Sequence, residues 1–383
     1  MISRLAVSGY RSVRNLVLEL GPLTLITGPN GSGKSSLHRA LRLLAETAQG
    51  RLVASLAAEG GLASTLWAGP ERFSREMIDG TMPVQGTARS APVALRLGFS
   101  GDDHGFAIDL GLPVPGHRFV HDPEIKLEAM WTGEVLGRAN LFAERRGPLV
   151  RLRRADDGGW RDAFTELLPF DSMVSHFADP VDGQELMILR ERLRSWRFYD
   201  NLRTDLDAPA RRPQIMTYTP VLGGDGADLA AAVATIQDIG DREGLASAID
   251  DAFPGATIGT AGGDFAMVTM QQPGLLRPLT AKELSDGTLR YVLLATALLS
   301  PRPPELMILN EPEASLHPSL IEALGRLLVG ASRRCQIVLV SHNERLVRSI
   351  RAERGVQHIE LSKTLGETRI VDHDPPGWVW PKR

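Results

Sequence analysis

The sequence has almost no cysteine and no long apolar run, and each shortage excludes a class of protein. Cys335 is the only cysteine, so no internal disulfide can form and we expect a reducing compartment. The longest apolar helix candidate, residues 291–299, is too short to span a bilayer. The first residues also lack the apolar core of a signal peptide. We therefore expect a soluble, cytoplasmic protein without a membrane partner.

An excess of charge of either sign is also lacking. The 383 residues include 43 lysines and arginines and 46 aspartates and glutamates, a formal net charge of −3. The whole molecule therefore does not attract nucleic acid or anionic lipid, and such binding would need a local patch. Internal repeats and sustained heptads are absent as well. The length favours one large domain or two joined domains.

The central part of the sequence alternates apolar and polar residues in short runs, which is typical of strands. Residues 92–100 and 105–112 predict a β-hairpin, and residues 125–131 and 149–153 extend it into an antiparallel sheet. From about Trp160 the spacing becomes helical. We expect a helix over 184–202 with Leu186, Leu189, Leu193 and Trp196 on one face, and then a linker or ordered loop over 209–226.

Apolar strands alternate with helices in the C-terminal part. The patterns predict helices over 228–238, 241–252, 285–299, 319–328 and 344–350, a strand pair near 256–272, and single strands over 306–309 and 337–340. Continuous apolar strands between helices are typical of a parallel sheet that is covered on both faces. The strand 23–27 has the same character. We therefore expect both ends of the chain to share one sheet, with the middle inserted.

Residues 28–35 read Gly-Pro-Asn-Gly-Ser-Gly-Lys-Ser and match the phosphate-binding pattern G-x-x-x-x-G-K-[ST]. A strand leads into this loop and an amphipathic helix follows it, as the pattern requires. Backbone N–H groups of such a loop surround a polyphosphate, and the helix N-terminus adds positive potential. We expect Lys34 to contact the β- and γ-phosphates and Ser35 to ligate Mg²⁺. The alternative is a glycine-rich turn without a ligand, which the complete context disfavours.

A second chemical element follows the strand 306–309. Asn310 and Glu311 lie at its carboxyl end, where phosphate-binding α/β proteins place acidic residues near Mg²⁺ or the attacking water. We expect Glu311 to polarise that water. Asn310 stands where aspartate is usual and brings no negative charge, so it predicts weaker or slower Mg²⁺-dependent chemistry. A surface acidic turn after a buried strand is the alternative.

Three further segments occur in a fixed order. Leu284-Ser285-Asp286-Gly287-Thr288 resembles the signature motif of ABC-type ATPases, although plain helix capping would also explain Ser285. Residues 314–318 occupy the place of their D-loop. Ser341-His342 resembles their switch histidine, although a structural loop histidine is the alternative. With the opening residues 5–13, these motifs resemble the SMC/RecF/OLD-like ATPases of bacteria over residues 1–70 and 280–345.

The resemblance implies an α/β P-loop NTPase with an ABC-type ATPase head, consisting of a mixed sheet core, an antiparallel β subdomain and an inserted helical lobe. It divides the chain into an N-terminal part of the head (1–155), an insertion lobe (156–275) and a C-terminal part of the head (276–383). It also implies ATP and Mg²⁺ as cofactors, held between two copies of the chain. The family often serves DNA maintenance or phage defence, which leaves DNA or an effector protein as candidate partners.

The resemblance assigns the site residue by residue. Lys34, Glu311 and His342 are catalytic, and Ser35 and Asn310 hold the metal. Ser285 and Gly287 contact the γ-phosphate in trans, and Arg11 lies near the nucleotide by position only. The expected nucleotide contacts are Arg11, Gly28, Pro29, Asn30, Gly31, Ser32, Gly33, Lys34, Ser35, Ser36, Ser285 and Gly287. The glutamine of the family has two candidates, Gln85 and Gln184.

Two arginine-rich segments are candidates for contact with nucleic acid. Residues 190–203 mix arginines with aromatic residues, but an apolar stripe there predicts a helix with a solvated basic face. Residues 145–154 form a weaker patch that is mixed with acidic residues.

Two alternatives to a cycling ATPase stay open. One is an ATP-gated binding switch with very slow turnover, which Asn310 favours. The other is the nucleotide-binding subunit of a transporter, which the long stretch between Lys34 and Glu311 disfavours.

Overall fold

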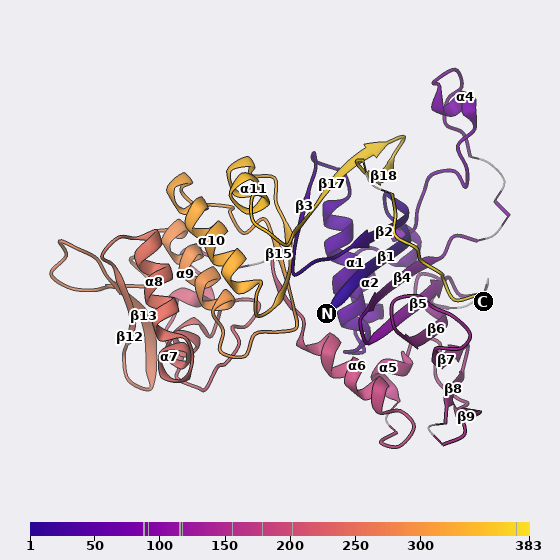
Figure 1. Ribbon diagram of the computed structural model, residues 1–383, viewed down its shortest axis with the longest axis horizontal. Helices are drawn as coiled ribbons and strands as arrows, with labels where there is room; N and C mark the ends of the chain where they lie inside the picture. Colours follow the sequence, from indigo (N-terminus) through magenta and orange to yellow (C-terminus); the bar gives the residue numbers. More distant parts are fainter. Residues whose placement is uncertain are drawn as a thin grey trace. The chain divides into compact units, whose positions relative to one another are not determined.

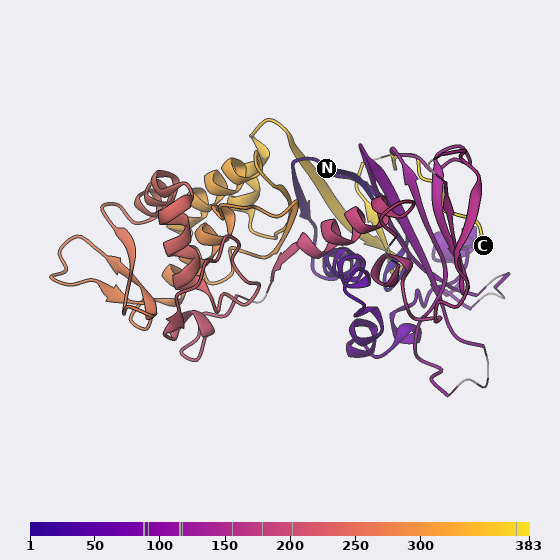
Figure 2. The same ribbon diagram turned by 90° about the horizontal axis from the view of Figure 1, so that it is seen from below.

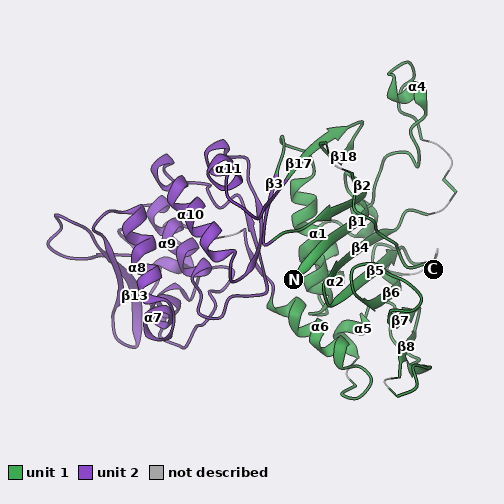
Figure 3. Cartoon of the chain, in the orientation of Figure 1, with its two compact units in different colours: residues 1–21, 27–195, 359–383 green, residues 22–26, 196–358 purple. Residues whose placement is uncertain are grey.

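The computed structural model divides the chain into two compact units (Figure 3). Unit 1 comprises residues 1–21, 27–195 and 359–383, and unit 2 comprises residues 22–26 and 196–358. The structure describes residues 1–86, 89–90, 92–114, 116, 118–154, 156–177, 179–200, 202–372 and 374–383.

An antiparallel sheet is the main sheet of unit 1 (Figures 1 and 2). Its eight strands follow the order β2-β1-β4-β5-β6-β7-β8-β9. Their bounds are β1 (Ile2–Tyr10), β2 (Val13–Glu19), β4 (Leu95–Gly101), β5 (His104–Gly111), β6 (Glu124–Thr132), β7 (Leu141–Arg146), β8 (Leu149–Arg153) and β9 (Trp160–Phe164). The predicted hairpin and its extension are therefore confirmed, and β7 is an additional strand between the two predicted ones.

Unit 1 also contains the described helices α1 (Lys34–Thr47), α2 (Leu52–Ala58), α3 (Leu62–Thr65), α4 (Arg75–Ile78), α5 (Met173–His176) and α6 (Gln184–Ser195). Helix α1 packs its leucine face against β1 and β4, and α6 packs against α1. The hairpin of β17 (Val356–Thr364) and β18 (Glu367–Ile370) belongs to this unit from residue 359 onwards. The helix that was predicted after the glycine-rich loop is confirmed.

Four parallel strands lie in unit 2 in the order β10 (Arg197–Tyr199), β15 (Leu306–Asn310), β16 (Gln336–Val340) and β3 (Leu23–Thr27). Because β3 pairs with β16, strands from both ends of the sequence share one sheet, as the apolar runs predicted. A smaller antiparallel sheet contains β11 (Gln214–Ile215), β12 (Thr257–Ala261), β13 (Phe265–Gln271) and β14 (Leu279–Thr280).

The helices of unit 2 surround one apolar core. They are α7 (Leu229–Ile239), α8 (Arg242–Ala252), α9 (Asp286–Leu298), α10 (Ile321–Ala331) and α11 (Glu344–Arg351), with 3₁₀ turns η1 (Pro209–Arg211) and η2 (Pro318–Leu320). Helix α9 is buried on nearly every side and carries Leu289, Val292 and Leu293 into this core. All five predicted helices and the predicted strands of this region are confirmed.

The structure corrects two helix predictions. Trp160 begins strand β9, because residues 160–164 pair with β8 and the Trp160 ring packs under the guanidinium groups of Arg151 and Arg153. The helix predicted over 184–202 ends at Ser195. Residues 197–199 instead form β10 beside β15, and the buried Tyr199 hydroxyl donates to the carbonyl of Leu222 at 2.7 Å. In both places strand pairing overrides the local spacing, with the adjacent β8 in the first case and with the distant β15 in the second.

The compact units also cut across the predicted segments. Residues up to Ser195 pack with unit 1, because α6 lies on α1 and Arg194 Nε donates to the carbonyl of Ala48 at 3.1 Å. From Trp196 onwards the chain belongs to unit 2, where β10 joins β15. The predicted insertion 156–275 is thus divided between the units, and residue 155 at its predicted boundary lies outside the described residues.

A buried ion pair stabilises the antiparallel sheet of unit 1. Arg145 on β7 and Glu128 on β6 are both fully buried, with 3.3 Å between Arg145 Nη1 and Glu128 Oε2. The remaining Arg145 N–H groups donate to the carbonyls of Gly147, Leu168 and Asp171. Burial raises the pKa of Glu128, against the opposing charge of Arg145 and the hydrogen bonds from the Ser172 hydroxyl and the Met173 N–H. Each of these two charged groups is therefore the counter-ion of the other.

We expect Arg145→Met to lower the free energy of unfolding by about 3–5 kcal/mol, because it leaves the Glu128 carboxylate buried without a counter-ion. The neighbouring variant Arg146→Met is the matched control. Arg146 is half exposed and pairs with Glu144, so its loss should cost less than about 1 kcal/mol. Urea unfolding of both variants measures the difference, and equal losses would contradict this account.

Candidate functional site

The glycine-rich loop of unit 1 has a backbone that only glycine adopts easily. Gly28, Gly31 and Gly33 have φ angles of +141°, +77° and +110°. A Cβ at Gly28 would lie 2.3 Å from the carbonyl oxygen of Leu361, and one at Gly33 would lie 2.3 Å from Thr368 Oγ1. The hairpin of β17 and β18 therefore packs directly on the loop. Thr368 strengthens this contact, because its hydroxyl donates to the carbonyl of Ser32 at 2.8 Å.

The loop and the start of α1 fit a polyphosphate. Helix α1 begins after Gly33 with no side-chain cap and no acidic residue in its first turn, so its first N–H groups and its dipole are left for an anion. Lys34 is 6% exposed, and its Nζ donates to the carbonyls of Gly28 at 2.6 Å and Pro29 at 3.1 Å. These carbonyl oxygens lie where phosphate oxygens would compete for the ammonium group. Ser32 Oγ is buried and has no partner among the described residues.

Three strand ends meet in unit 2. The parallel register pairs Asn310 with Val340, and Val340 with Ile26. The ladder continues past the strands, because Glu311 N donates to the carbonyl of Val340 at 2.8 Å and Ser341 N donates to that of Ile26 at 3.1 Å. Asn310, Glu311 and His342 therefore lie at one sheet edge, and the glycine-rich loop begins two residues beyond Ile26. Gly28 to Ser36 and Arg11 belong to unit 1, whereas Ser285 and Gly287 belong to unit 2 with Asn310, Glu311 and His342.

Glu311 contacts the predicted switch histidine. Its Oε1 lies 3.1 Å from His342 Nδ1, and both side chains are exposed to solvent. Glu311 has a φ angle of +48°, which is uncommon for a residue with a side chain. Such strained backbone is often found at functional sites, where the surrounding structure maintains it. The arrangement can hold a water beside Glu311 while His342 orients its carboxylate.

Sequence reasoning missed Glu313, which is 5% exposed and lies two residues beyond Glu311. Its Oε1 accepts a hydrogen bond from Ser341 Oγ at 2.5 Å, and its Oε2 has no partner in the described part of the chain. Glu313 therefore connects the end of β15 to the end of β16. The pairing of this glutamate with the serine before His342 would have been difficult to infer without the register of the sheet.

The signature segment caps helix α9. Ser285 Oγ accepts a hydrogen bond from the N–H of Thr288, as the helix-capping alternative expects. Gly287 packs closely on the D-loop, because a Cβ there would lie 2.9 Å from the carbonyl oxygen of Ser315. The first turn of α9 lies at the surface, because Ser285 and Asp286 are exposed.

Arg211 supports the signature segment and was also missed. It is 3% exposed, and its guanidinium donates to the carbonyls of Ala281 and Leu284 at 2.7 and 2.8 Å. It also donates to Asp286 Oδ1 at 2.8 Å, and its Nε donates to the carbonyl of Thr204 at 2.9 Å. The sequence signal was an arginine pair before a proline, which indicates only a loop.

Arg11 is bound within unit 1. Its Nη2 donates to Glu59 Oε2 at 2.5 Å, and the Tyr10 hydroxyl and Arg39 share the same carboxylate. Burial tends to lower the pKa of Arg11, but the hydrogen bond and the charge of Glu59 raise it overall. Because Arg39 lies on α1, this cluster places Arg11 beside the helix that follows the glycine-rich loop. Of the glutamine candidates, Gln85 is in an exposed loop and Gln184 begins α6.

The two arginine patches are not open basic surfaces. Arg192 is 12% exposed and lies 3.7 Å from Asp103, and Arg194 contacts Ala48 and Glu191, so the predicted solvated face is mostly engaged within unit 1. In the second patch Arg145 is buried. Its neighbours pair with acidic residues or backbone: Arg146 with Glu144, Arg151 with Glu144 and Asp162, Arg153 with the carbonyl of Ala139, and Arg154 with Asp157.

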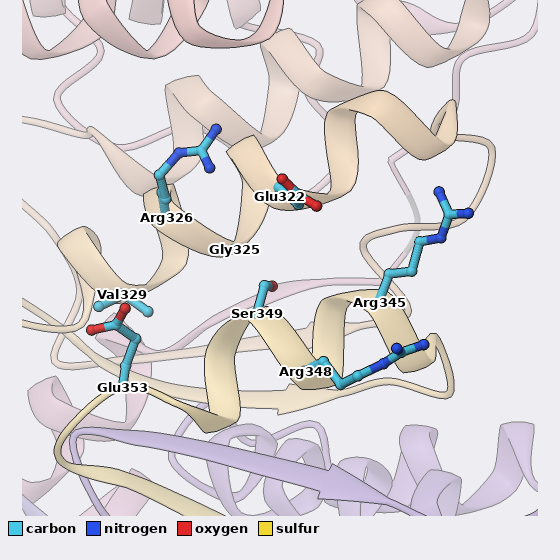
Figure 4. A pocket seen from close by; sticks show the side chains of 8 residues that line it. All are labelled: Glu322, Gly325, Arg326, Val329, Arg345, Arg348, Ser349 and Glu353. Atoms are coloured by element: carbon cyan, nitrogen blue, oxygen red, sulfur yellow. The ribbon is translucent and has the colours of Figure 1, made fainter.

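A hollow of about 720 Å³ lies between helices α10 and α11 (Figure 4). The helices approach closely at Gly325, where a Cβ would lie 2.4 Å from Ser349 Oγ. Arg345 and Arg348 line one end, but Glu322 and Glu353 also line the hollow, and Arg326 is held by Asp251. This mixture of charges selects no ligand class, and none of the predicted site residues lines it.

Neither a metal-binding cluster nor a membrane-spanning helix occurs among the described residues. No group of three side chains suited to bind a metal occurs among them. No helix in the described part of the chain has the length and apolar character that a membrane crossing needs.

Comparison with protein families gives two matches. Residues 152–348, just over half of the chain, match the model described as "AAA domain, putative AbiEii toxin, Type IV TA system". Residues 4–47 match a second AAA-domain model. A curated relative, the OLD nuclease of Thermus scotoductus, is 48% identical over 44 residues. Those residues are 12% of this chain and 8% of that protein, so the chain matches only a small part of its length.

The fold is similar to solved SMC heads. The SMC head domain from Thermotoga maritima has a TM-score of 0.50 and 16% identity, over 97% of this chain and 99% of that one. An Smc head bound to the C-winged helix domain of ScpA has a TM-score of 0.56 and 12% identity, over 97% of both chains. An Smc head with an extended coiled coil, bound to the C-terminal domain of ScpA and derived from Pyrococcus furiosus, has values of 0.52 and 11%, over 97% and 95%. At these identities the likeness shows the fold alone.

We expect Gly33→Ala to destabilise the protein more than Gly31→Ala. Both positions have positive φ, which costs roughly 1–2 kcal/mol for a residue with a Cβ. Only the Cβ at position 33 would collide with Thr368, since nothing lies within 4 Å of the one at position 31. Urea unfolding should show at least twice the loss for Gly33→Ala. In a Thr368→Ala background the excess should shrink, and an unchanged excess would contradict the steric explanation.

Proposed function

Because the chain belongs to the AAA-domain family described as putative AbiEii toxin of a type IV TA system, we propose that it binds and hydrolyses Mg²⁺-ATP between two copies of itself. The resemblance to SMC/OLD-like P-loop ATPases is confirmed by the family matches and by the SMC-head fold. ATP hydrolysis by this chain and its dimerisation are the proposal.

The observation that carries the proposal is the uncapped N-terminus of α1 behind three glycines of positive φ, with Lys34 held inside the loop. Glycine adopts such angles at little steric cost, and the backbone N–H groups of such a loop suit an anion. The residues that would hold the triphosphate are Gly28 to Ser36, with Ser35 and Asn310 toward Mg²⁺. The metal would neutralise charge on the phosphates, while Lys34 holds them and Glu311 orients the water.

Chain connectivity and register support the participation of Glu311 and His342. The glycine-rich loop follows β3, and β3 is the neighbour of β16, whose other neighbour is β15. In parallel α/β sheets the carboxyl ends of such strands hold the ligand. We infer that Glu311 polarises the attacking water and that His342, 3.1 Å from Glu311, holds its carboxylate in place.

A second copy is proposed to complete each site. The exposed first turn of α9 offers the Ser285 hydroxyl and the N–H groups around Gly287 to a phosphate. By likeness to the family, this turn faces the nucleotide held by the other copy. Two of the solved Smc heads with a similar fold are bound to domains of ScpA. By analogy alone, we propose that this chain also uses a protein partner.

Asn310 supports a second candidate, an ATP-gated switch with very slow turnover. An amide at this position accepts a hydrogen bond from a metal-bound water but adds no charge to hold the metal. In this candidate, ATP closes the dimer and hydrolysis only limits how long it stays closed. We assign either cycle to DNA maintenance or phage defence on family likeness alone. Phosphate release with and without duplex DNA tests that assignment, and stimulation by DNA would support it.

We expect Lys34→Ala to weaken ATP binding at least tenfold, because it removes the cation that the loop encloses. Lys382→Ala, which removes an exposed lysine far along the sequence, should leave binding unchanged. Fluorescent ATP titration measures both. Normal binding by Lys34→Ala would contradict the ATPase and the switch together.

Glu311→Gln should retain ATP binding, abolish steady phosphate release and accumulate an ATP-dependent dimer, since the amide cannot act as a base. Light scattering and phosphate release with Mg²⁺-ATP measure this. Wild-type protein that dimerises without measurable phosphate release would favour the switch over the cycling ATPase.

Mixing two inactive variants tests whether the sites are shared. Lys34→Ala and Ser285→Arg should each lack phosphate release alone. A mixed dimer has one site with both lesions and one site built from the intact loop of one chain and the intact signature of the other. We expect a 1:1 mixture to recover phosphate release, toward about a quarter of the wild-type value, because half of the randomly formed dimers are mixed and each has one intact site. No recovery, with mixed dimers detected, would exclude a site completed in trans.

A further inference from the structure

Helix α9 lies between two segments of unit 2 that the proposed function assigns to different nucleotides. Its first turn carries the signature residues Ser285 and Gly287. One turn further along, Arg290 points to the segment that carries Glu311. The first two turns of α9 therefore connect a residue of one proposed site with a residue of the other.

Arg290 holds backbone rather than an acidic side chain. Its Nη2 donates to the carbonyl of Glu311 at 3.3 Å, its Nη1 to that of Leu202 at 2.8 Å, and its Nε to that of Pro312 at 3.4 Å. Burial lowers the pKa of Arg290, and the charge of Glu313 partly opposes this effect. Removing a guanidinium group from water costs free energy, and carbonyl acceptors offset only part of that cost. A position that bears this cost is a candidate for a functional role.

Two of the three carbonyl groups that Arg290 contacts, those of Glu311 and Pro312, belong to a strained turn. Glu311 has a φ angle of +48° and Ser315 one of +66°, and both angles are uncommon for residues with side chains. The carbonyl of Glu311 also accepts a hydrogen bond from Ala314 N at 3.1 Å, so Arg290 adds to the contacts that hold this turn. Loss of Arg290 would leave fewer contacts beside the Glu311 carboxylate, which now lies 3.1 Å from His342 Nδ1.

The first turn of α9 is tied to the same turn from the other side. Gly287 lies against the carbonyl of Ser315, and Arg211 fixes Asp286 and the residues before it. Direct contacts therefore connect the signature residues, Arg290 and the turn 311–315. Helix α9 is the element through which a nucleotide contact at Ser285 would reach the Glu311 of the same chain.

We propose that Arg290 is a positioning residue that holds the Glu311 of its own chain in its active orientation and couples it to the signature turn. This inference rests on the proposed function. It assigns Arg290 to the site where its chain supplies Glu311, and not to the site where its chain supplies Ser285.

Single variants test the positioning role. We expect Arg290→Met to lower kcat at least tenfold while ATP affinity and ATP-dependent dimerisation stay within twofold of wild type. Arg290→Lys should recover part of kcat, because an ammonium group can still donate to one or two of the carbonyls. Arg302→Met, which changes an exposed arginine outside these contacts, is the matched control and should be unchanged. Thermal unfolding of each variant shows that the folded protein is compared.

Mixed dimers test which site Arg290 serves. In a mixture of Lys34→Ala and Ser285→Arg chains, the intact site takes its Glu311 from the Ser285→Arg chain and its signature from the Lys34→Ala chain. Adding Arg290→Met to the Ser285→Arg chain should abolish the recovered phosphate release. Adding it to the Lys34→Ala chain should leave that release unchanged.

Each of four results would overturn the inference. Wild-type kcat in Arg290→Met would show that Arg290 does not position Glu311. The reverse pattern in mixed dimers would assign Arg290 to the signature turn alone. Absence of recovery in the parent mixture would overturn the proposed function, and the inference with it, whereas recovery that Arg290→Met never changes would overturn the inference and leave the proposed function intact.

Discussion

The candidate site depends on the parallel backbone ladder that joins β3, β16 and β15. Each hydrogen bond of this ladder connects segments that are far apart in the sequence, and together they bring Ile26, Asn310 and Val340 to one edge. The ladder extends one residue further to Glu311 and Ser341. Asn310, Glu311 and His342 therefore need no contacts of their own to be collected at one edge, because the strands that precede them already share a register.

Fully or partly buried guanidinium groups hold the chain in place where the backbone is irregular. Arg145, Arg211 and Arg290 all donate to carbonyl groups of loops that follow strands or precede helices. Arginine suits this role because its planar group offers five donors in fixed directions and stays charged at any ordinary pH. The three donors of lysine lie on one nitrogen and cannot reach carbonyl groups in several fixed directions in the same way. The irregular parts of the site are thus held by side chains, whereas the regular parts are held by the sheet.

The sequence predicted the elements whose signal is local. Continuous apolar runs identified β15 and β16, and the glycine-rich loop with its flanking strand and helix identified the start of α1. It failed where strand pairing decides the outcome: β9 exists because the adjacent β8 pairs with it, and β10 because the distant β15 does. Arg211, Arg290 and Glu313 were overlooked for a similar reason, since a single arginine or glutamate has no pattern until its carbonyl or hydroxyl partner is known. The roles given to Ser285, Gly287 and Asn310 remain predictions.

Strand β3 belongs to unit 2, although the residues on both sides of it belong to unit 1. A ribosome makes β3 more than three hundred residues before its neighbour β16, so Leu23 and Leu25 have no sheet to join during most of synthesis. A fragment that stops near residue 195 would carry an unpaired apolar strand, and one that starts there would leave β16 with an open edge. The chain therefore has no cleavage point that yields two self-sufficient halves, and its C-terminal half cannot finish folding without five residues from the beginning of the sequence.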